Sequence, residues 1–71
     1  MSSFSDRLKK LRKSKTLTQK QVAEALSMTE RNYQRLEATS NPSNENLIRI
    51  ADYFDVSTDY LLGRSDNPAR H

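Results

Sequence analysis

The chain has 71 residues, a formal net charge of +3, no cysteine and a single histidine. A chain this short buries only about 60% of its unfolded surface, which predicts one domain with a small core and no deep substrate pocket. The lack of cysteine excludes disulfides and thiolate metal sites. No apolar run approaches the roughly 20 residues that span a bilayer, and we expect a cytoplasmic protein with no membrane segment, metal or cofactor.

The positive charge is concentrated in the first half of the chain. Residues 1–35 carry nine basic and three acidic side chains, whereas residues 36–71 carry three basic and six acidic ones. The two halves therefore have net charges of +6 and −3. This asymmetry predicts either a polyanionic partner for the first half or a solvated basic helix face, and charge alone does not separate the two.

The first two predicted elements are helices that follow capping residues. Ser3, with an acidic residue three positions later, resembles a capping box before a helix at about residues 4–14. Thr18 with Gln21 gives the same signal before a second helix at about residues 19–26. The low content of glycine and proline agrees with a helical chain.

The link between the second and third helices is unusually short, and this is the feature that points to a function. Only two residues separate Leu26 from Thr29, which caps a helix at about residues 30–38. So short a link makes the two helices cross at a steep angle, as in a helix-turn-helix. The polar face of the third helix has long, forked side chains, which suit base edges better than a core. An ordinary helix pair with a solvated face is the alternative.

Two further helices and a polar end complete the predicted order. Ser43 or Asn44 caps a fourth helix with apolar residues at i, i+3, i+4 and i+7. Ser57 caps a short fifth helix that Gly63 ends. The residues from Arg64 on are polar, and we expect them to fray.

Three stretches resemble the XRE family, also called the lambda-repressor-like or Cro/cI family. They are residues 17–26, 33–37 and 55–63. The similarity covers about residues 4–63 and implies an all-α, compact five-helix domain with a helix-turn-helix. It also implies repression of transcription by a homodimer bound to a palindromic double-stranded DNA operator. We therefore expect a DNA-binding domain at residues 1–63 and a polar C-terminal tail at residues 64–71.

The resemblance implies roles for single residues. Glu30, Arg31 and Arg35 match the main base-reading positions of the family, flanked by Gln34 and Asn32. The two arginines suit guanine, with a grip on phosphate as the alternative.

Phosphate contacts are expected beside the base-reading residues. Gln19 opens the second helix, where the family places a phosphate contact, and a helix N-terminus offers free N–H groups to an anion. Thr29 fits either such a contact or a capping role alone. The other candidates for phosphate contact are Thr18, Lys20, Ser40 and Asn41.

The family pattern also carries structural expectations. The matching Arg12 and Glu37 form an ion pair in the family, and we expect them within salt-bridge distance here. The family commonly has glycine where Ser27, Ala38 and Asp55 stand, at turns that often need a positive φ.

The dimer surface is expected on the fourth and fifth helices. One helix reads only about four base pairs, so we expect a dimer through the start of the fourth helix and the fifth, including Tyr60 and Leu62. The alternative function is a protein-interaction module, such as an antitoxin or the target of an anti-repressor, with a regulatory protein partner. We expect no enzyme, because the sequence lacks a Ser/His/Asp set, a metal cluster and a phosphate-cradling glycine loop.

Overall fold

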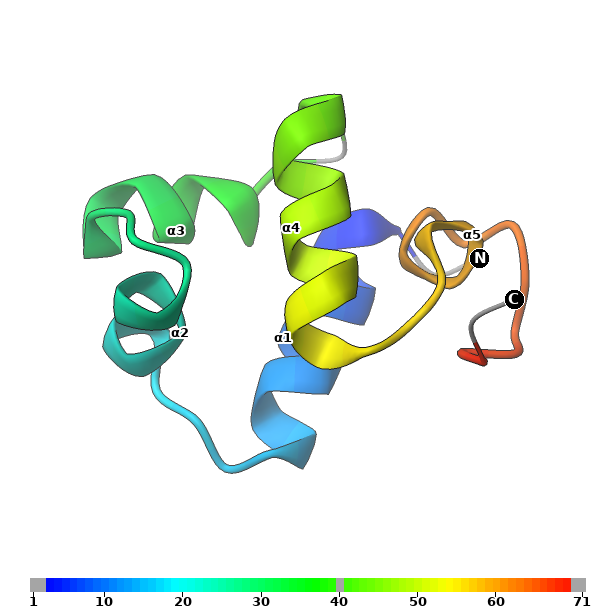
Figure 1. The fold of residues 1–71 in the computed structure, drawn as a ribbon, viewed down its shortest axis with the longest axis horizontal. Coiled ribbons are helices and arrows are strands. Elements are labelled where there is room, and N and C mark those ends of the chain that lie inside the picture. The colour runs from blue at the N-terminus through cyan, green and yellow to red at the C-terminus, as the bar shows by residue number, and fades with distance from the viewer. Residues whose placement is uncertain (1–2, 40, 70–71) are drawn as a thin grey trace.

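The computed structural model describes residues 3–39 and 41–69. In these residues the chain forms five helices and no strand, which confirms the predicted all-α fold (Figure 1). The helices are α1 (Phe4–Ser14), α2 (Gln19–Ala25), α3 (Glu30–Leu36), α4 (Asn44–Phe54) and α5 (Thr58–Leu61). Helices α2 and α3 end one and two residues earlier than the sequence pattern predicts.

Each helix begins at a hydroxyl cap. The cap side chain accepts a hydrogen bond from the backbone N–H three residues later, which satisfies one of the free donors of the first turn. At α2 the cap is reciprocal, because Thr18 N also donates to Gln21 Oε1 at 2.8 Å. The five caps are Ser3, Thr18, Thr29, Ser43 and Ser57. The predicted starting points are therefore confirmed, with Ser43 rather than Asn44 capping α4.

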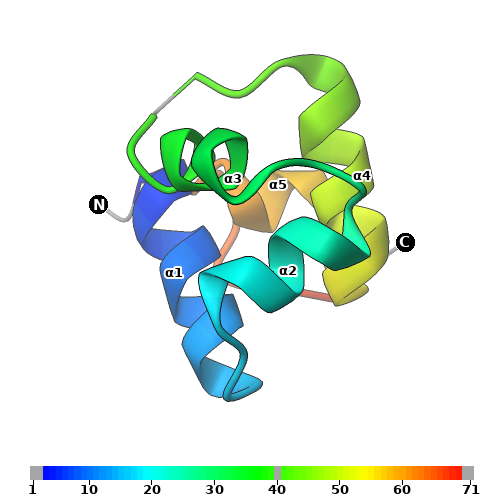
Figure 2. The same cartoon turned by 90° about the vertical axis from the view of Figure 1, so that its left-hand side faces the viewer.

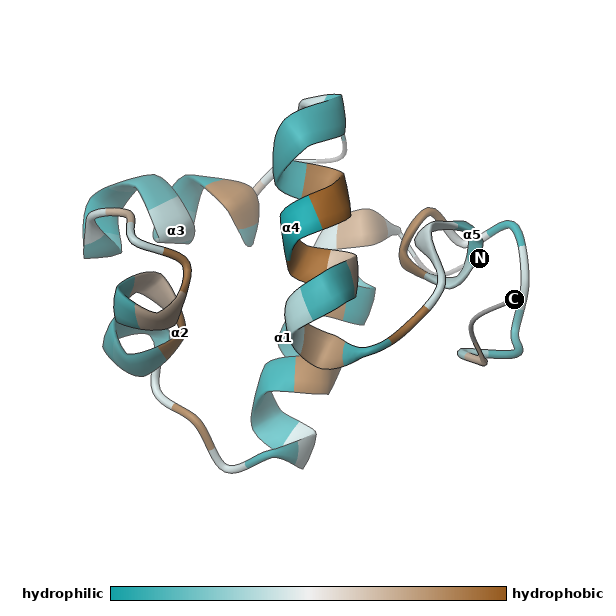
Figure 3. Ribbon diagram, viewed as in Figure 1, coloured by the Kyte–Doolittle hydropathy of each residue, from teal (hydrophilic) through white to brown (hydrophobic). Residues whose placement is uncertain are grey.

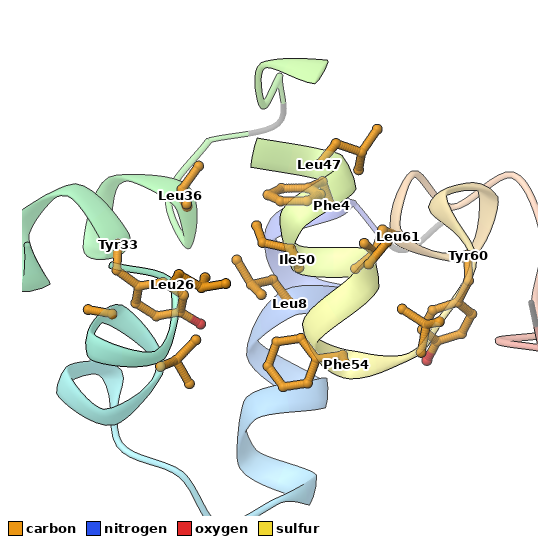
Figure 4. Packing of buried hydrophobic residues seen from close by; sticks show 14 residues of the cluster. Phe4, Leu8, Leu26, Tyr33, Leu36, Leu47, Ile50, Phe54, Tyr60 and Leu61 are labelled. Atoms are coloured by element: carbon orange, nitrogen blue, oxygen red, sulfur yellow. The ribbon is translucent and has the colours of Figure 1, made fainter. Parts of the chain in front are cut away.

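The core lies where all five helices meet around α4. Figure 1 shows α2 and α3 on one side of α4, α5 and the chain end on the other, and α1 behind. Every helix contributes one large, fully buried side chain to this cluster, and Figure 4 shows most of them converging. These are Leu8, Val22, Tyr33, Ile50 and Leu61. Burial of each stabilises the fold by about 1.5–3 kcal/mol relative to exposure, so α3 is fixed to the core through Tyr33.

The link between α2 and α3 is a tight turn. Leu26 N donates to Val22 O and Met28 N to Ala23 O, both at 3.0 Å. Ala23 is almost fully buried, which agrees with close approach of the two helices. Figure 2 views the molecule from this side and shows α2 and α3 joined by the turn. The α2–α3 pair is therefore held as one unit against the rest of the domain.

Positive φ angles occur at some of the expected turns. Ser27 and Asp55 have φ of 57° and 55°, as the comparison with family glycines predicts. The expectation was wrong for Ala38, which keeps a negative φ because the turn after α3 continues with right-handed geometry. Thr16 was not predicted and has a φ of 55°. A β-branched residue in this region is strained, at a cost of roughly 1–2 kcal/mol.

Replacing Thr16 by glycine is expected to raise the free energy of unfolding by about 1 kcal/mol, because glycine adopts positive φ without strain. Urea denaturation of both proteins measures the change. Thr58→Gly is the control, since Thr58 is the first residue of α5 and lacks a positive φ, and this change should destabilise. An equal loss of stability in both variants would show that Thr16 is not strained.

The described part of the C-terminal tail makes hydrogen bonds to the domain. Arg7 Nη2 donates to Asp66 Oδ1 at 2.8 Å, and its Nη1 donates to Ser65 O at 3.3 Å. The Arg7 guanidinium also lies 4.3 Å from the ring centroid of Tyr60. Ser57 N donates to Pro68 O at 3.0 Å. Fraying was expected from local polarity, but contacts from α1 and the start of α5 hold these residues against the domain.

Candidate nucleic-acid interface

The outer face of α3 is built by helical periodicity. Tyr33 and Leu36 are buried, and they fix the side of α3 that meets the core. At 100° per residue, Arg31 lies opposite that side. Figure 3 shows the hydrophobic end of α3 turned toward α4 and hydrophilic residues elsewhere on the helix. The five predicted base-contacting residues are all exposed, namely Glu30, Arg31, Asn32, Gln34 and Arg35.

The predicted phosphate-contacting residues lie at the start of α2, at the cap of α3 and in the loop before α4. Thr18 and Lys20 are exposed at the start of α2, and Gln19 between them is half-buried. Thr29 is exposed but already caps α3, where its Oγ1 accepts from Asn32 N at 3.1 Å. Asn41 is exposed in the loop before α4, and Ser40 lies outside the described residues.

An ion pair joins α1 to the end of α3. Arg12 Nε donates to Glu37 Oε2 at 2.5 Å, and Arg12 Nη2 donates to Glu37 Oε1 at 3.2 Å. A third donor of Arg12 binds Leu17 O at 3.0 Å. The Glu37 side chain is only 3% exposed and that of Arg12 14%, so solvent screens the pair weakly.

The ion pair continues as a row of hydrogen bonds toward the exposed face of α3. Gln19 Nε2 donates to Glu37 Oε1 at 3.1 Å. Gln34 Nε2 donates to Gln19 Oε1 at 3.3 Å and to Glu30 Oε2 at 3.5 Å. This row was not predicted, because Gln19 is 15 residues from Gln34 and 18 residues from Glu37, and partners so far apart leave no local sequence pattern. Gln19, expected to contact phosphate, has its side chain engaged inside the protein.

The comparisons with known proteins agree with this geometry. The model of the helix-turn-helix family matches residues 8–61. The chain belongs to this family. The XRE resemblance that the sequence suggested is thereby confirmed, and α2 and α3 are the two helices of the motif. No solved structure matches the chain.

Several curated relatives of this helix-turn-helix chain are regulators. The uncharacterised HTH-type transcriptional regulators YobD and YqaE of Bacillus subtilis are 39% and 45% identical, over 92% and 90% of this chain. The cryptic phage CTXphi transcriptional repressor RstR of Vibrio cholerae is 37% identical over 83% of this chain. The matches cover 59%, 56% and 54% of these three relatives, so the chain spans little more than half their length.

Two of the nine basic residues in the first half of the helix-turn-helix chain are used within the fold. Arg12 pairs with Glu37, as the family pattern implied, and Arg7 pairs with Asp66, which was not expected, so neither belongs to a free basic face. The seven that remain exposed are Lys9, Lys10, Lys13, Lys15, Lys20, Arg31 and Arg35. The positive charge available to a polyanion is thus borne by α1, α2 and α3.

A groove borders the helix-turn-helix between α3 and α4. Its volume is about 450 Å³, and Asn32 and Arg35 of α3 face Arg49 of α4 across it. In the part of the chain that the structure describes, no cluster of potential metal ligands is present. No helix of these residues is long and apolar enough to cross a membrane.

Burial and hydrogen bonding act against each other at Glu37. Burial alone raises the pKa of this carboxyl group, but the hydrogen bond from Arg12, the nearby Tyr33 hydroxyl, the hydrogen bond from Gln19 and the charge of Arg12 together outweigh it, and the pKa lies below its ordinary value. The pKa of Tyr33 is raised, mainly because its hydroxyl is buried. Glu37 is therefore ionised at neutral pH and acts only as a hydrogen-bond acceptor.

Ionised Glu37 is expected to stabilise the domain in a pH-dependent way. Its pKa is lower in the folded state than the ordinary value of 4.5. The stabilisation is therefore full above about pH 4.5 and is lost as the pH falls through the folded-state pKa. Urea denaturation should show that wild type exceeds Glu37→Gln in stability at neutral pH and that the difference shrinks in acid. Glu24→Gln, on the exposed face of α2, is the control. A difference that stays constant down to about pH 3 would contradict the assignment.

Proposed function

We propose that this chain is the DNA-binding part of a cytoplasmic transcriptional repressor that places α3 in the major groove of a duplex operator. The observation that carries the proposal is the α3 face, where five polar side chains are exposed on a helix fixed by Tyr33 and Leu36. A rigid helix that presents donors and acceptors can compare base edges, because the major groove has a distinct pattern for each base pair. The transcriptional regulators among the relatives of this chain support the same proposal.

The charges on α3 suggest which bases are read. Arg31 and Arg35 are one turn apart on the exposed face, and each guanidinium can donate two hydrogen bonds to guanine O6 and N7. Glu30 can only accept, which suits the amine of cytosine. We therefore propose two guanines in each half-site, with phosphate contacts from Thr18, Lys20 and Asn41 beside them.

We propose that the repressor binds as a homodimer, because one α3 helix covers too few base pairs to specify a genomic site. Of the two residues suggested for the dimer surface, Leu62 is 38% exposed, whereas Tyr60 is 8% exposed and packs inside under Arg7. Tyr60 is therefore no longer proposed as part of the dimer surface. Ile48 of α4, which is 53% exposed, is proposed in its place.

Selection of bound sequences from a random duplex pool tests the DNA-binding proposal. We expect a two-fold symmetric consensus with half-sites about 34 Å apart. If four phosphates are neutralised, affinity should fall roughly 100-fold between 50 and 200 mM salt. A pool that yields no consensus would contradict sequence-specific binding. Equal affinity for an isolated half-site and for the full palindrome would contradict the proposed dimer but not the proposed DNA binding.

A further inference from the structure

The Glu37 carboxylate determines which group donates and which accepts in the row of hydrogen bonds that leads through Gln19 to α3. The Glu37 carboxylate has no proton to donate, so Gln19 must present its amide NH₂ to it, at 3.1 Å. The carbonyl oxygen of Gln19 then faces Gln34, which must donate to it from its own NH₂ group, at 3.3 Å. An amide turned the other way at either position would bring two acceptors together.

Glu30 lies at the other end of this row of hydrogen bonds. The Gln34 NH₂ has two protons, and its second acceptor is Glu30 Oε2 at 3.5 Å. Gln34 Oε1 has no hydrogen-bond partner within residues 3–39 and 41–69. Since Gln34 is exposed on α3, the group it leaves for a ligand is an acceptor and not a donor.

We propose, on the basis of the function proposed above, that Gln19 is a specificity-determining residue that fixes Gln34 with its carbonyl oxygen toward the DNA. A free glutamine amide can offer a donor and an acceptor together, as in its paired contact with adenine N6 and N7. Gln34 offers only the acceptor. It therefore favours bases with a major-groove amine, cytosine or adenine, over guanine and thymine, which present O6 and O4. Gln19 is a positioning residue in this scheme, because it acts through Gln34.

Binding to a panel of four duplexes tests the proposal. The duplexes differ only at the base pair whose preference is lost in Gln34→Ala. We expect wild type to favour cytosine or adenine there by about tenfold, and Gln19→Met to reduce this to about twofold or less, because the Gln34 amide then keeps only its long 3.5 Å contact with Glu30 and can turn. Lys20→Met, next to it on the exposed side of α2, is the matched control. It should weaken binding equally on all four duplexes.

A second readout uses the free protein and does not depend on DNA binding. Nuclear magnetic resonance follows the side-chain amide protons of Gln34. In wild type these protons should exchange slowly with solvent, and in Gln19→Met at least tenfold faster, with dispersed backbone signals showing that both proteins are folded. Unchanged Gln34 exchange, or an unchanged base preference in Gln19→Met, would overturn the proposal. A wild type with no base preference anywhere would overturn the DNA-binding function instead, and the amide exchange would still decide the role of Gln19.

Discussion

Replacing Arg12 by methionine is expected to lower the free energy of unfolding by about 3–5 kcal/mol. The change leaves the Glu37 carboxylate, which is 3% exposed, with Gln19 as its remaining side-chain donor. It also removes the hydrogen bond from Arg12 to Leu17 O, which ties the α1–α2 loop to α1. A domain of this length has only about 4–10 kcal/mol of stability, so the loss would leave it close to unfolding. Urea denaturation at neutral pH measures the effect.

The matched control for this prediction is Lys13→Met. Lys13 is the next residue of α1 and is exposed, so its replacement should change stability by less than about 0.5 kcal/mol. The double variant Arg12→Met, Glu37→Leu should recover much of the loss, because it leaves no buried charge. A loss of under about 1 kcal/mol for Arg12→Met would place the pair among ordinary surface ion pairs.

Arg31→Ala is expected to weaken operator binding by about 1–3 kcal/mol and to relax the preference for guanine at one base pair. Arg31 lies opposite the buried side of α3 and has no ion-pair partner within the described residues. Its guanidinium is therefore free to bind a base edge. Fluorescence anisotropy on duplexes changed at single base pairs would measure both effects.

The control for Arg31 is Arg64→Ala. Arg64 comes shortly after α5, a helix that lies on the side of α4 away from α3 (Figure 1). The Arg64 side chain is 73% exposed. Its removal should leave both affinity and base preference almost unchanged. If Arg31 grips phosphate, Arg31→Ala would weaken binding equally on every sequence and lower the salt slope by about one. That result would contradict base reading by Arg31.

Features that depend on neighbours in the sequence were predictable. A helix cap involves residues three positions apart, so a hydroxyl residue before an apolar periodic stretch located the start of every helix. The short link between Leu26 and Thr29 likewise predicted the α2–α3 pair, because geometry leaves few ways to connect two helices by so few residues. The exposed set on α3 followed from helical periodicity once Tyr33 and Leu36 were assigned to the core.

Most features that the local sequence does not encode were missed, and the one long-range ion pair that was expected came from the family pattern. Arg7 looked like one more cation of a basic helix face, but its partner Asp66 is 59 residues away. Gln19 looked like a phosphate contact because of its place in α2, and the structure engages its side chain with Glu37 and Gln34. Thr16 carries no signal in its own residue type for a positive φ, since glycine or asparagine is the usual residue there. These three positions become apparent only when the helices are packed.

The most direct test of the central claim replaces guanine by 7-deazaguanine, one position at a time, in the selected operator. This change removes only the N7 acceptor in the major groove and leaves the phosphates intact. At the guanine read by Arg31, wild type should bind the modified duplex about tenfold more weakly, whereas Arg31→Ala should bind both duplexes equally. Equal binding by wild type to natural and modified duplexes at every guanine would contradict major-groove reading by α3.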